Sequence, residues 1–311
     1  VFNMVVANVI RGEGYSLHAG LGLSLGGVLN IALDPFFVLP FGLNMNIKGA
    51  AIATLISNVV TTLYFAILLI VIRKKSVVSF SPKKACLAIK EKIARNVLFT
   101  GLPSALQTML SAVSNLVLNS LMIGYGETAE AAIGVTKKID AVPFGMVTGL
   151  AQGAAPLIAY NNGAKKYDKM KTTLKLSLCY CVGLAITVLI VVESAAGALI
   201  EVFIKDASTV TYGEKFLRLH CASLPFMAVT FMLVSYFQAV GAKGKAFVLS
   251  IIRKGIVDIP LMYLLNVLIP VYGIVACQPI TDVISATVGV ILYVLWKKKF
   301  QKTEEEQEII V

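Results

Sequence analysis

Eight apolar runs, each long enough to cross a lipid bilayer, follow one another along the sequence. A transmembrane helix needs about 20 consecutive apolar residues, and only 14% of this chain is charged, compared with about 25% in soluble domains. Residues 1–10 are typical of the end of a further span. The pattern predicts an all-α, polytopic transmembrane helix bundle with about eight spans and a cut one before them. The eight runs are 20–41, 47–72, 97–123, 131–159, 174–203, 215–240, 247–269 and 272–296.

The net charge of +11 follows the predicted spans. Of the 28 Lys and Arg residues, 22 are Arg11 or lie in the segments 73–95, 160–175, 241–254 and 297–302. Cytoplasmic loops of membrane proteins carry such an excess. These segments and the C-terminus are therefore predicted to be cytoplasmic, and the charge indicates topology rather than a nucleic-acid partner.

The run Asn30–Phe37 places an acid, an amide and a proline in apolar surroundings. An ionised Asp at the centre of a membrane helix costs roughly 3 kcal/mol, so intramembrane acids are usually functional. Asn30 and Asp34 are four residues apart and share a helix face. Together they could hold a cation or a proton. Pro35 leaves a carbonyl without its helical partner, which a membrane tolerates only beside protein or water.

The next span begins with the small residues Gly49–Ala53 and then Thr54. Small residues allow two membrane helices to approach closely. The Thr54 hydroxyl could therefore face Asp34. Hydrogen bonding to its own helix backbone is an equal alternative.

Four polar residues recur at four-residue steps in the span 97–123. Because this spacing puts them on one face, the span lines either a cavity or a polar seam between helices. The four are Gln107, Ser111, Asn115 and Asn119.

The following span contains Lys137 and Asp140. They are three residues apart and could pair on one helix face. A structural ion pair is the favoured interpretation of Asp140, and a substrate-binding acid is the alternative.

A weak internal duplication relates the two ends of the chain. Arg11–Ala19 aligns with Gln238–Ala246, and Gly49–Val60 aligns with Gly273–Ile284 at an offset of 224 residues. Asn30–Pro35 has a rough counterpart in Asp258–Pro260. The offset corresponds to six spans, so the copies have the same orientation. Parallel repeats of this kind are found in two-lobed secondary transporters.

Several segments together resemble the multidrug and toxic compound extrusion (MATE) family of cation-coupled exporters. The matching segments are 30–37, 49–54, 101–104, 152–156 and 160–167. The resemblance implies twelve helices in two six-helix lobes. On that basis residues 1–72 are the remaining part of the N-lobe, 73–95 a cytoplasmic linker, 96–299 the C-lobe and 300–311 a cytoplasmic tail.

The resemblance also implies a cation site in the N-lobe. Family members of this kind use an Asp and an Asn one turn apart on the fifth helix, a Thr on the sixth and an Asp on the first. Asp34, Asn30 and Thr54 match the first three. Other members carry acids on the seventh and tenth helices, where this chain has none. Coupling to Na⁺ or H⁺ is therefore expected in the N-lobe.

The expected function is secondary antiport, in which organic cations or drugs leave in exchange for Na⁺ or H⁺ by alternating access. We expect a bacterial plasma-membrane protein that is monomeric at full length and needs no cofactor other than the coupling ion. Gln107, Ser111, Asn115, Asn119 and Asp140 are the candidate cavity residues. An enzyme is not expected, because no nucleophile–base pair or metal set can be assembled. The alternatives are a flippase for lipid-linked oligosaccharides and a membrane sensor or scaffold that transports nothing.

Overall fold

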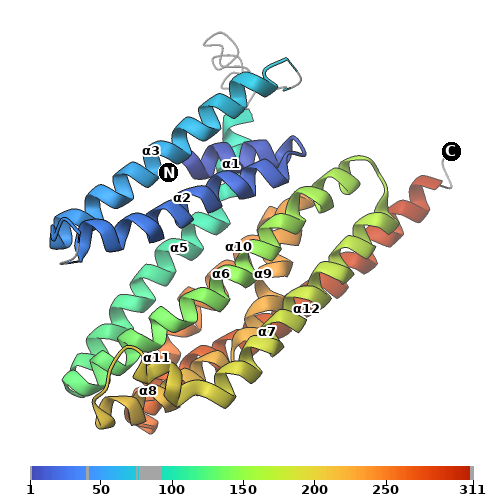
Figure 1. Ribbon diagram of the computed structural model, residues 1–311. Coiled ribbons are helices and arrows are strands. Elements are labelled where there is room, and N and C mark those ends of the chain that lie inside the picture. Colours follow the sequence, from blue (N-terminus) through green and yellow to red (C-terminus); the bar gives the residue numbers. More distant parts are fainter. Residues whose placement is uncertain (1, 40–41, 75, 77–92, 309–311) are drawn as a thin grey trace. The chain divides into compact units, whose positions relative to one another are not determined.

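The computed structural model describes residues 2–39, 42–74, 76 and 93–308, and every regular element in these ranges is a helix (Figure 1). The all-α prediction is confirmed. The helices are α1 (Phe2–Gly12), α2 (Ser16–Val38), α3 (Asn46–Ile72), α5 (Ile93–Ile123), α6 (Glu127–Gly163), α7 (Tyr167–Glu201), α8 (Ala207–Cys221), α9 (Leu224–Ala239), α10 (Lys243–Ile251), the π-helix η1 (Ile252–Ile256), α11 (Asp258–Leu268) and α12 (Tyr272–Glu308).

The chain divides into two compact units, Val1–Ile93 and Ala94–Val311. The first contains α1 to α3, and the second contains α5 to α12. Most of the predicted cytoplasmic linker, residues 77–92, lies outside the described residues, as do residues 309–311 of the predicted tail. The predicted lobe boundaries and the side of the membrane on which each loop lies stay predictions.

In the described part of the chain, six helices are long and apolar enough to cross a membrane: α2, α3, α5, α6, α7 and α12 up to Lys298. Helices α8 and α9, which meet at an angle of 41°, form a seventh candidate if they count as one span. The sequence predicts eight spans. The difference lies at 247–269, where α10, η1 and α11 are separate short helices and carry buried charges.

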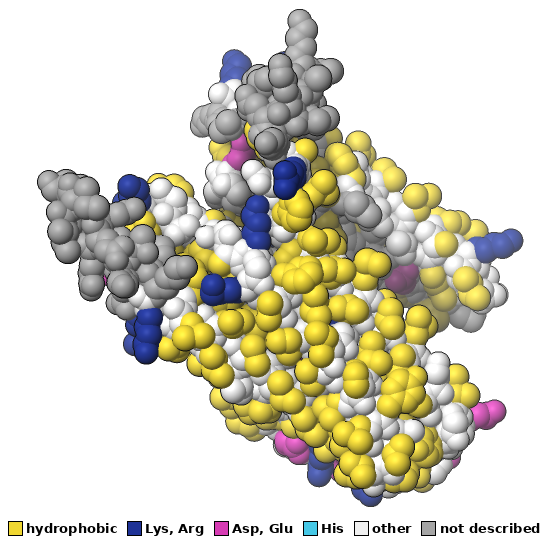
Figure 2. Space-filling model, turned by 180° about the vertical axis from the view of Figure 1, so that it is seen from behind, with side chains coloured by type: hydrophobic (Ala, Val, Ile, Leu, Met, Phe, Trp, Pro, Cys, Tyr) yellow, Lys and Arg dark blue, Asp and Glu magenta, His cyan; other side chains and the backbone are white. Residues whose placement is uncertain are grey.

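Apolar side chains cover much of the helices' outer surface. Leu98, Ile70 and Val267 are each more than 70% exposed, and hydrophobic side chains cover large parts of the face in Figure 2. Soluble monomers rarely expose large continuous apolar patches. Lipid is the natural solvent for this surface, so the chain is a multi-pass membrane protein.

Close contact between α2 and α3 builds the first unit. Gly22 of α2 faces Phe65 of α3, where a Cβ atom would come within 2.6 Å of the Phe65 ring. Ile10 of α1 and Ala19 of α2 complete this core with Phe65, and all three are fully buried. Glycine at this crossing therefore allows α2 and α3 to pack face to face.

Two hydrophobic clusters hold the second unit together. In one, Tyr236 of α9 packs edge-on against Tyr293 and Trp296 of α12. In the other, Phe216 of α8 packs edge-on against Tyr272 at the start of α12. Helix α12 thus belongs to both clusters and is tied along its length to α8 and α9.

The π-helix η1 interrupts the helical rod that leads from α10 to α11. In it the Val257 amide donates to the Ile252 carbonyl five residues earlier, at 3.3 Å. A π-bulge adds one residue to a helical turn and often marks a functional site. The inserted turn carries two adjacent cations, Arg253 and Lys254, and Arg253 is only 2% exposed.

Helix α8 begins at an exposed cap. The Asp206 carboxylate accepts hydrogen bonds from the Ser208 hydroxyl (2.5 Å), the Thr209 hydroxyl (2.7 Å) and the Thr209 amide (2.9 Å). These bonds lower the pKa of the Asp206 carboxyl from 3.8 to about 2. The cap is therefore at full strength above pH 3.8 and is lost as the pH falls through about 2.

We expect Asp206→Ala to lower the melting temperature at neutral pH, because the first turn of α8 loses an acceptor for its amide. Asp206→Asn, which keeps an N-cap acceptor but cannot titrate in this range, should lose less. Thermal unfolding followed by fluorescence checks both variants. Equal melting temperatures for Asp206→Ala and the parent at neutral pH would contradict the role of this cap.

Candidate functional site

The three predicted N-lobe residues lie together between α2 and α3. The Asn30 amide nitrogen donates to the Asp34 carboxylate at 3.5 Å and to the Thr54 hydroxyl at 3.4 Å. Both bonds are long by hydrogen-bond standards. The Asn30 side chain therefore bridges the Asp34 carboxylate and the Thr54 hydroxyl through two long hydrogen bonds.

Asp34 makes no ion pair with any described residue. It is partly buried on α2, and Thr54 is exposed on α3. The neighbours of Asp34 on its own helix are apolar apart from Asn30. A carboxylate without an ion-pair partner is costly inside a membrane span, and such residues are usually functional.

The four polar residues predicted to share a face of α5 become more exposed from the N-terminal to the C-terminal end of the helix. Gln107 is 8% exposed, and its amide nitrogen is buried without a hydrogen-bond partner in the described structure. Ser111 is partly buried, whereas Asn115 and Asn119 are exposed in this chain. Their membership of a substrate cavity stays a prediction.

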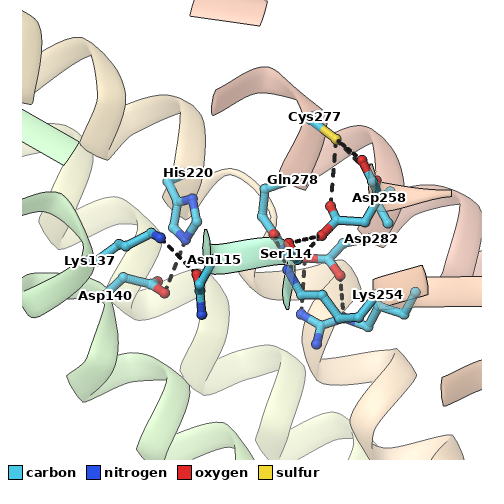
Figure 3. A network of polar contacts seen from close by, with 12 residues as sticks. Ser114, Asn115, Lys137, Asp140, His220, Lys254, Asp258, Cys277, Gln278 and Asp282 are labelled. Atoms are coloured by element: carbon cyan, nitrogen blue, oxygen red, sulfur yellow. Dashed lines mark hydrogen bonds and ion pairs between the residues drawn. The ribbon is translucent and has the colours of Figure 1, made fainter. Parts of the chain in front are cut away.

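Lys137 and Asp140 find different partners from those the spacing suggests. The Lys137 ammonium donates to the Asn115 amide oxygen of α5 at 2.7 Å. Asp140 instead lies 3.2 Å from the His220 ring nitrogen of α8, and Figure 3 shows these two pairs side by side. The favoured interpretation of an ion pair between Lys137 and Asp140 is therefore wrong. Each side chain connects α6 to a different helix.

A larger polar network lies among η1, α11, α12 and α5. Asp258 accepts from the Ser114 hydroxyl at 2.5 Å and from the Lys254 ammonium at 3.2 Å. Lys254 also donates to the Gln278 amide oxygen at 2.6 Å. Figure 3 shows Ser114 and Lys254 meeting at Asp258, with Gln278 on the other side of Lys254.

The network continues from Gln278 to a second ion pair. The Gln278 amide nitrogen donates to Asp282 at 2.9 Å. Arg253 binds the same carboxylate through Nε at 2.5 Å and through a terminal nitrogen at 3.4 Å. Its guanidinium also lies 4.7 Å from the centre of the Phe231 ring of α9. The planar fork of Arg suits this bidentate contact.

Charge in this network balances. Two cations, Arg253 and Lys254, face two carboxylates, Asp258 and Asp282. The side chains of Arg253, Asp258 and Asp282 are at most 2% exposed, and that of Lys254 is 13% exposed. Charges buried to this extent are tolerated when they are paired and hydrogen-bonded.

The predicted spans 247–269 and 272–296 place Asp258 and Asp282 inside the membrane, but sequence spacing alone did not identify their partners. Arg253 and Lys254 were counted with the basic segment 241–254, which was predicted to be a cytoplasmic loop. The four-residue spacing of Lys254 and Asp258 was the available signal, since it allows an ion pair on one helix face. No comparable signal pointed to Arg253, whose acid is 29 residues away.

Buried, paired charges in a lipid-facing helix bundle define an α-helical membrane protein with a polar interior. The MatE family model matches residues 103–264, more than half of the chain. The chain therefore belongs to the MATE family.

Named relatives agree with this assignment. The multidrug export protein MepA of Staphylococcus saprophyticus is 30% identical over 302 residues, which cover 97% of this chain and 65% of the relative. MepA of Staphylococcus aureus strain N315 is 28% identical over 306 residues, 98% of this chain and 66% of the relative. The chain thus spans about two-thirds of the length of these relatives.

Solved structures resemble the fold closely. An outward-facing multidrug resistance MATE transporter of the MOP superfamily aligns with a TM-score of 0.85 and 26% identity, over 97% of this chain and 67% of that one. A MATE structure in complex with MaL6 aligns with a TM-score of 0.84 and 25% identity, over the same shares.

Proposed function

We propose that the chain forms the larger part of a secondary antiporter that exports organic cations in exchange for Na⁺ or H⁺. The observation that carries the proposal is the lone Asp34 carboxylate, which shares its surroundings with Asn30 and Thr54 in otherwise apolar helices. The printed names of its relatives, multidrug export proteins, support the same class of cargo.

Three groups at this site suit a small hard cation. Asp34 supplies a carboxylate, Thr54 a hydroxyl and Asn30 an amide that can turn its oxygen inward. Oxygen ligands are those that hard cations prefer. A proton on Asp34 is the simpler alternative, because it neutralises the same charge without any further ligand.

Ion binding can drive transport only if it favours one conformation over another. An empty Asp34 carries a negative charge that is costly to enclose in an apolar helix pair. A bound cation removes that cost, so closure around the site becomes easier. Ion entry and drug exit are then linked through the same equilibrium, as alternating access requires.

The remaining features of the proposal concern setting and partners. The protein lies in the bacterial plasma membrane with a cytoplasmic C-terminus, acts as a monomer at full length and catalyses no covalent reaction. A cavity with apolar and aromatic walls and a few polar groups accommodates varied cations, and Gln107, Ser111, Asn115, Asn119 and Asp140 are its proposed polar residues. A pyrophosphate-binding flippase has less support, because Asp282 and Asp258 neutralise Arg253 and Lys254.

The test is efflux of a fluorescent organic cation from bacteria that produce the protein carrying this chain. We expect Asp34→Asn to lose gradient-driven efflux almost completely, because an amide neither releases a proton nor offers a charge to Na⁺. Collapsing the Na⁺ gradient or the pH gradient separately then identifies the ion. Dye retention over time is the measurement.

Asp168→Asn is the matched control, because it removes one carboxylate that is fully exposed at the start of α7. It should transport like the parent. Efflux that persists in Asp34→Asn at the parent's rate, with equal amounts of both proteins in the membrane, would exclude Asp34 as the coupling group.

A further inference from the structure

In the weak internal repeat, α11 and α12 correspond to α2 and α3, because Asp34 and Gly49 precede Asp258 and Gly273 by the same 224 residues. In each pair a glycine begins the second helix and contacts the last turn of the first. A Cβ atom on Gly49 would come within 2.8 Å of the Phe37 carbonyl carbon, and one on Gly273 within 2.7 Å of the Leu265 carbonyl carbon. The two pairs therefore share a close backbone approach at the same position of the repeat.

Both pairs place a nitrogen donor between an acid and an oxygen of the second helix. In the first pair Asn30 donates to Asp34, four residues later, and to Thr54, five residues after Gly49. In the second pair Lys254 donates to Asp258, also four residues later, and to Gln278, which stands five residues after Gly273. The pattern of connections is the same in both units.

The donors differ in charge. Asn30 is neutral, so Asp34 remains without a charged partner among the described residues. Lys254 brings a full positive charge to within 3.2 Å of Asp258. Because Arg253 already neutralises Asp282, the second network has no charge left to offer to a further cation.

We propose that Asp258, Ser114 and Gln278 form a site for a monovalent cation, and that the Lys254 ammonium permanently fills it. The Lys254 ammonium touches two oxygens, one of the Asp258 carboxylate and one of the Gln278 amide, and the Ser114 hydroxyl lies 2.5 Å from the same Asp258 oxygen. The tethered ammonium therefore stands where a small cation held by these oxygens would bind. The second unit then takes up no exchangeable Na⁺ while Lys254 is present. Removing the ammonium opens the site to Na⁺.

Lys254 can fill this site whether or not the protein transports anything. The comparison with the first unit, however, rests on the proposed function of Asp34. The test therefore begins from Asp34→Asn, in which the first site is silent. Binding of radioactive ²²Na⁺ to the purified protein in detergent at pH 8, with choline as the competing counter-cation, is the measurement. Binding of ²²Na⁺ to the parent protein, which retains Asp34, tests the proposed function of the first site separately.

We expect Asp34→Asn to bind Na⁺ only at background level. Asp34→Asn with Lys254→Met should gain bound Na⁺ by at least about tenfold, because Asp258 then lacks its partner. Adding Asp258→Asn should remove the gain. Lys254→Arg, which keeps a tethered cation, should stay at background.

Absence of a gain in a folded Lys254→Met protein, judged by its elution as a single species, would overturn the proposal. A second measurement decides the question if that variant does not fold. With Lys254 intact, Asp34→Asn is compared with Asp34→Asn plus Asp258→Asn. Equal background binding in both supports a filled site, and Na⁺ binding that disappears with Asp258→Asn refutes it.

Discussion

Asp282→Ala is expected to destabilise the folded protein by about 3–5 kcal/mol, because it leaves a buried guanidinium without its counter-charge. Arg253 is 2% exposed, and its partner carboxylate is fully buried. The variant also removes the acceptor of the Gln278 amide. The free energy of unfolding in detergent, from denaturant titration followed by fluorescence, measures the loss.

The exposed ion pair of Arg218 with Glu214 on α8 is the matched control. Its atoms lie 2.7 Å apart, but its side chains are 46% and 36% exposed. Glu214→Ala should therefore cost less than about 1 kcal/mol.

The double variant Arg253→Met with Asp282→Leu distinguishes the cost of an unpaired charge from the value of the pair. Replacing both partners with apolar residues of similar volume is often neutral. We expect the double variant to recover most of the stability that Asp282→Ala loses. A double variant no more stable than the single one would show that the contacts themselves, rather than the uncompensated charge, dominate.

Gly273→Ala is expected to destabilise the protein by about 1–3 kcal/mol, because there is no room for another carbon at this crossing. The new Cβ would come within 2.7 Å of the Leu265 carbonyl carbon and closer still to its oxygen. Since both atoms belong to the backbone, the last turn of α11 must move away from α12. Gly49→Ala should behave similarly, since its Cβ would meet the backbone of Phe37.

Gly183→Ala in α7 is the matched control. A Cβ atom there has no neighbour within 4 Å, so the substitution should be neutral or slightly stabilising through helix propensity. Thermal unfolding of the three variants in the same detergent compares them. Equal melting temperatures for Gly273→Ala and Gly183→Ala would exclude tight packing at this crossing.

The sequence predicted those parts of the structure that depend on local spacing. Apolar runs located the long helices, because a span must be about 20 residues long. The four-residue interval between Asn30 and Asp34 put both on one face of α2, where they are hydrogen-bonded. For the Thr54 hydroxyl on the next helix, the sequence left two partners equally open, Asp34 and the backbone of its own helix. In the structure the hydroxyl instead accepts a hydrogen bond from Asn30.

Partners on other helices could not be predicted in the same way. Lys137 and Asp140 have the spacing of a pair, yet Lys137 donates to Asn115 of α5 and Asp140 contacts His220 of α8. Arg253 looked like a loop cation because nothing in its neighbourhood reveals Asp282. Hydrophobic spacing records which face of a helix is buried, but not which helix covers it.

The balanced charge of the second network has a consequence for how membrane voltage acts on the protein. Moving one elementary charge across the membrane changes its energy by about 2.3 kcal/mol per 100 mV. Two cations and two carboxylates that move together as a rigid group carry no net charge through that field. The potential therefore does no net work on this group. In the first helix pair, by contrast, it acts on the charge of Asp34 unless an ion or a proton is bound there.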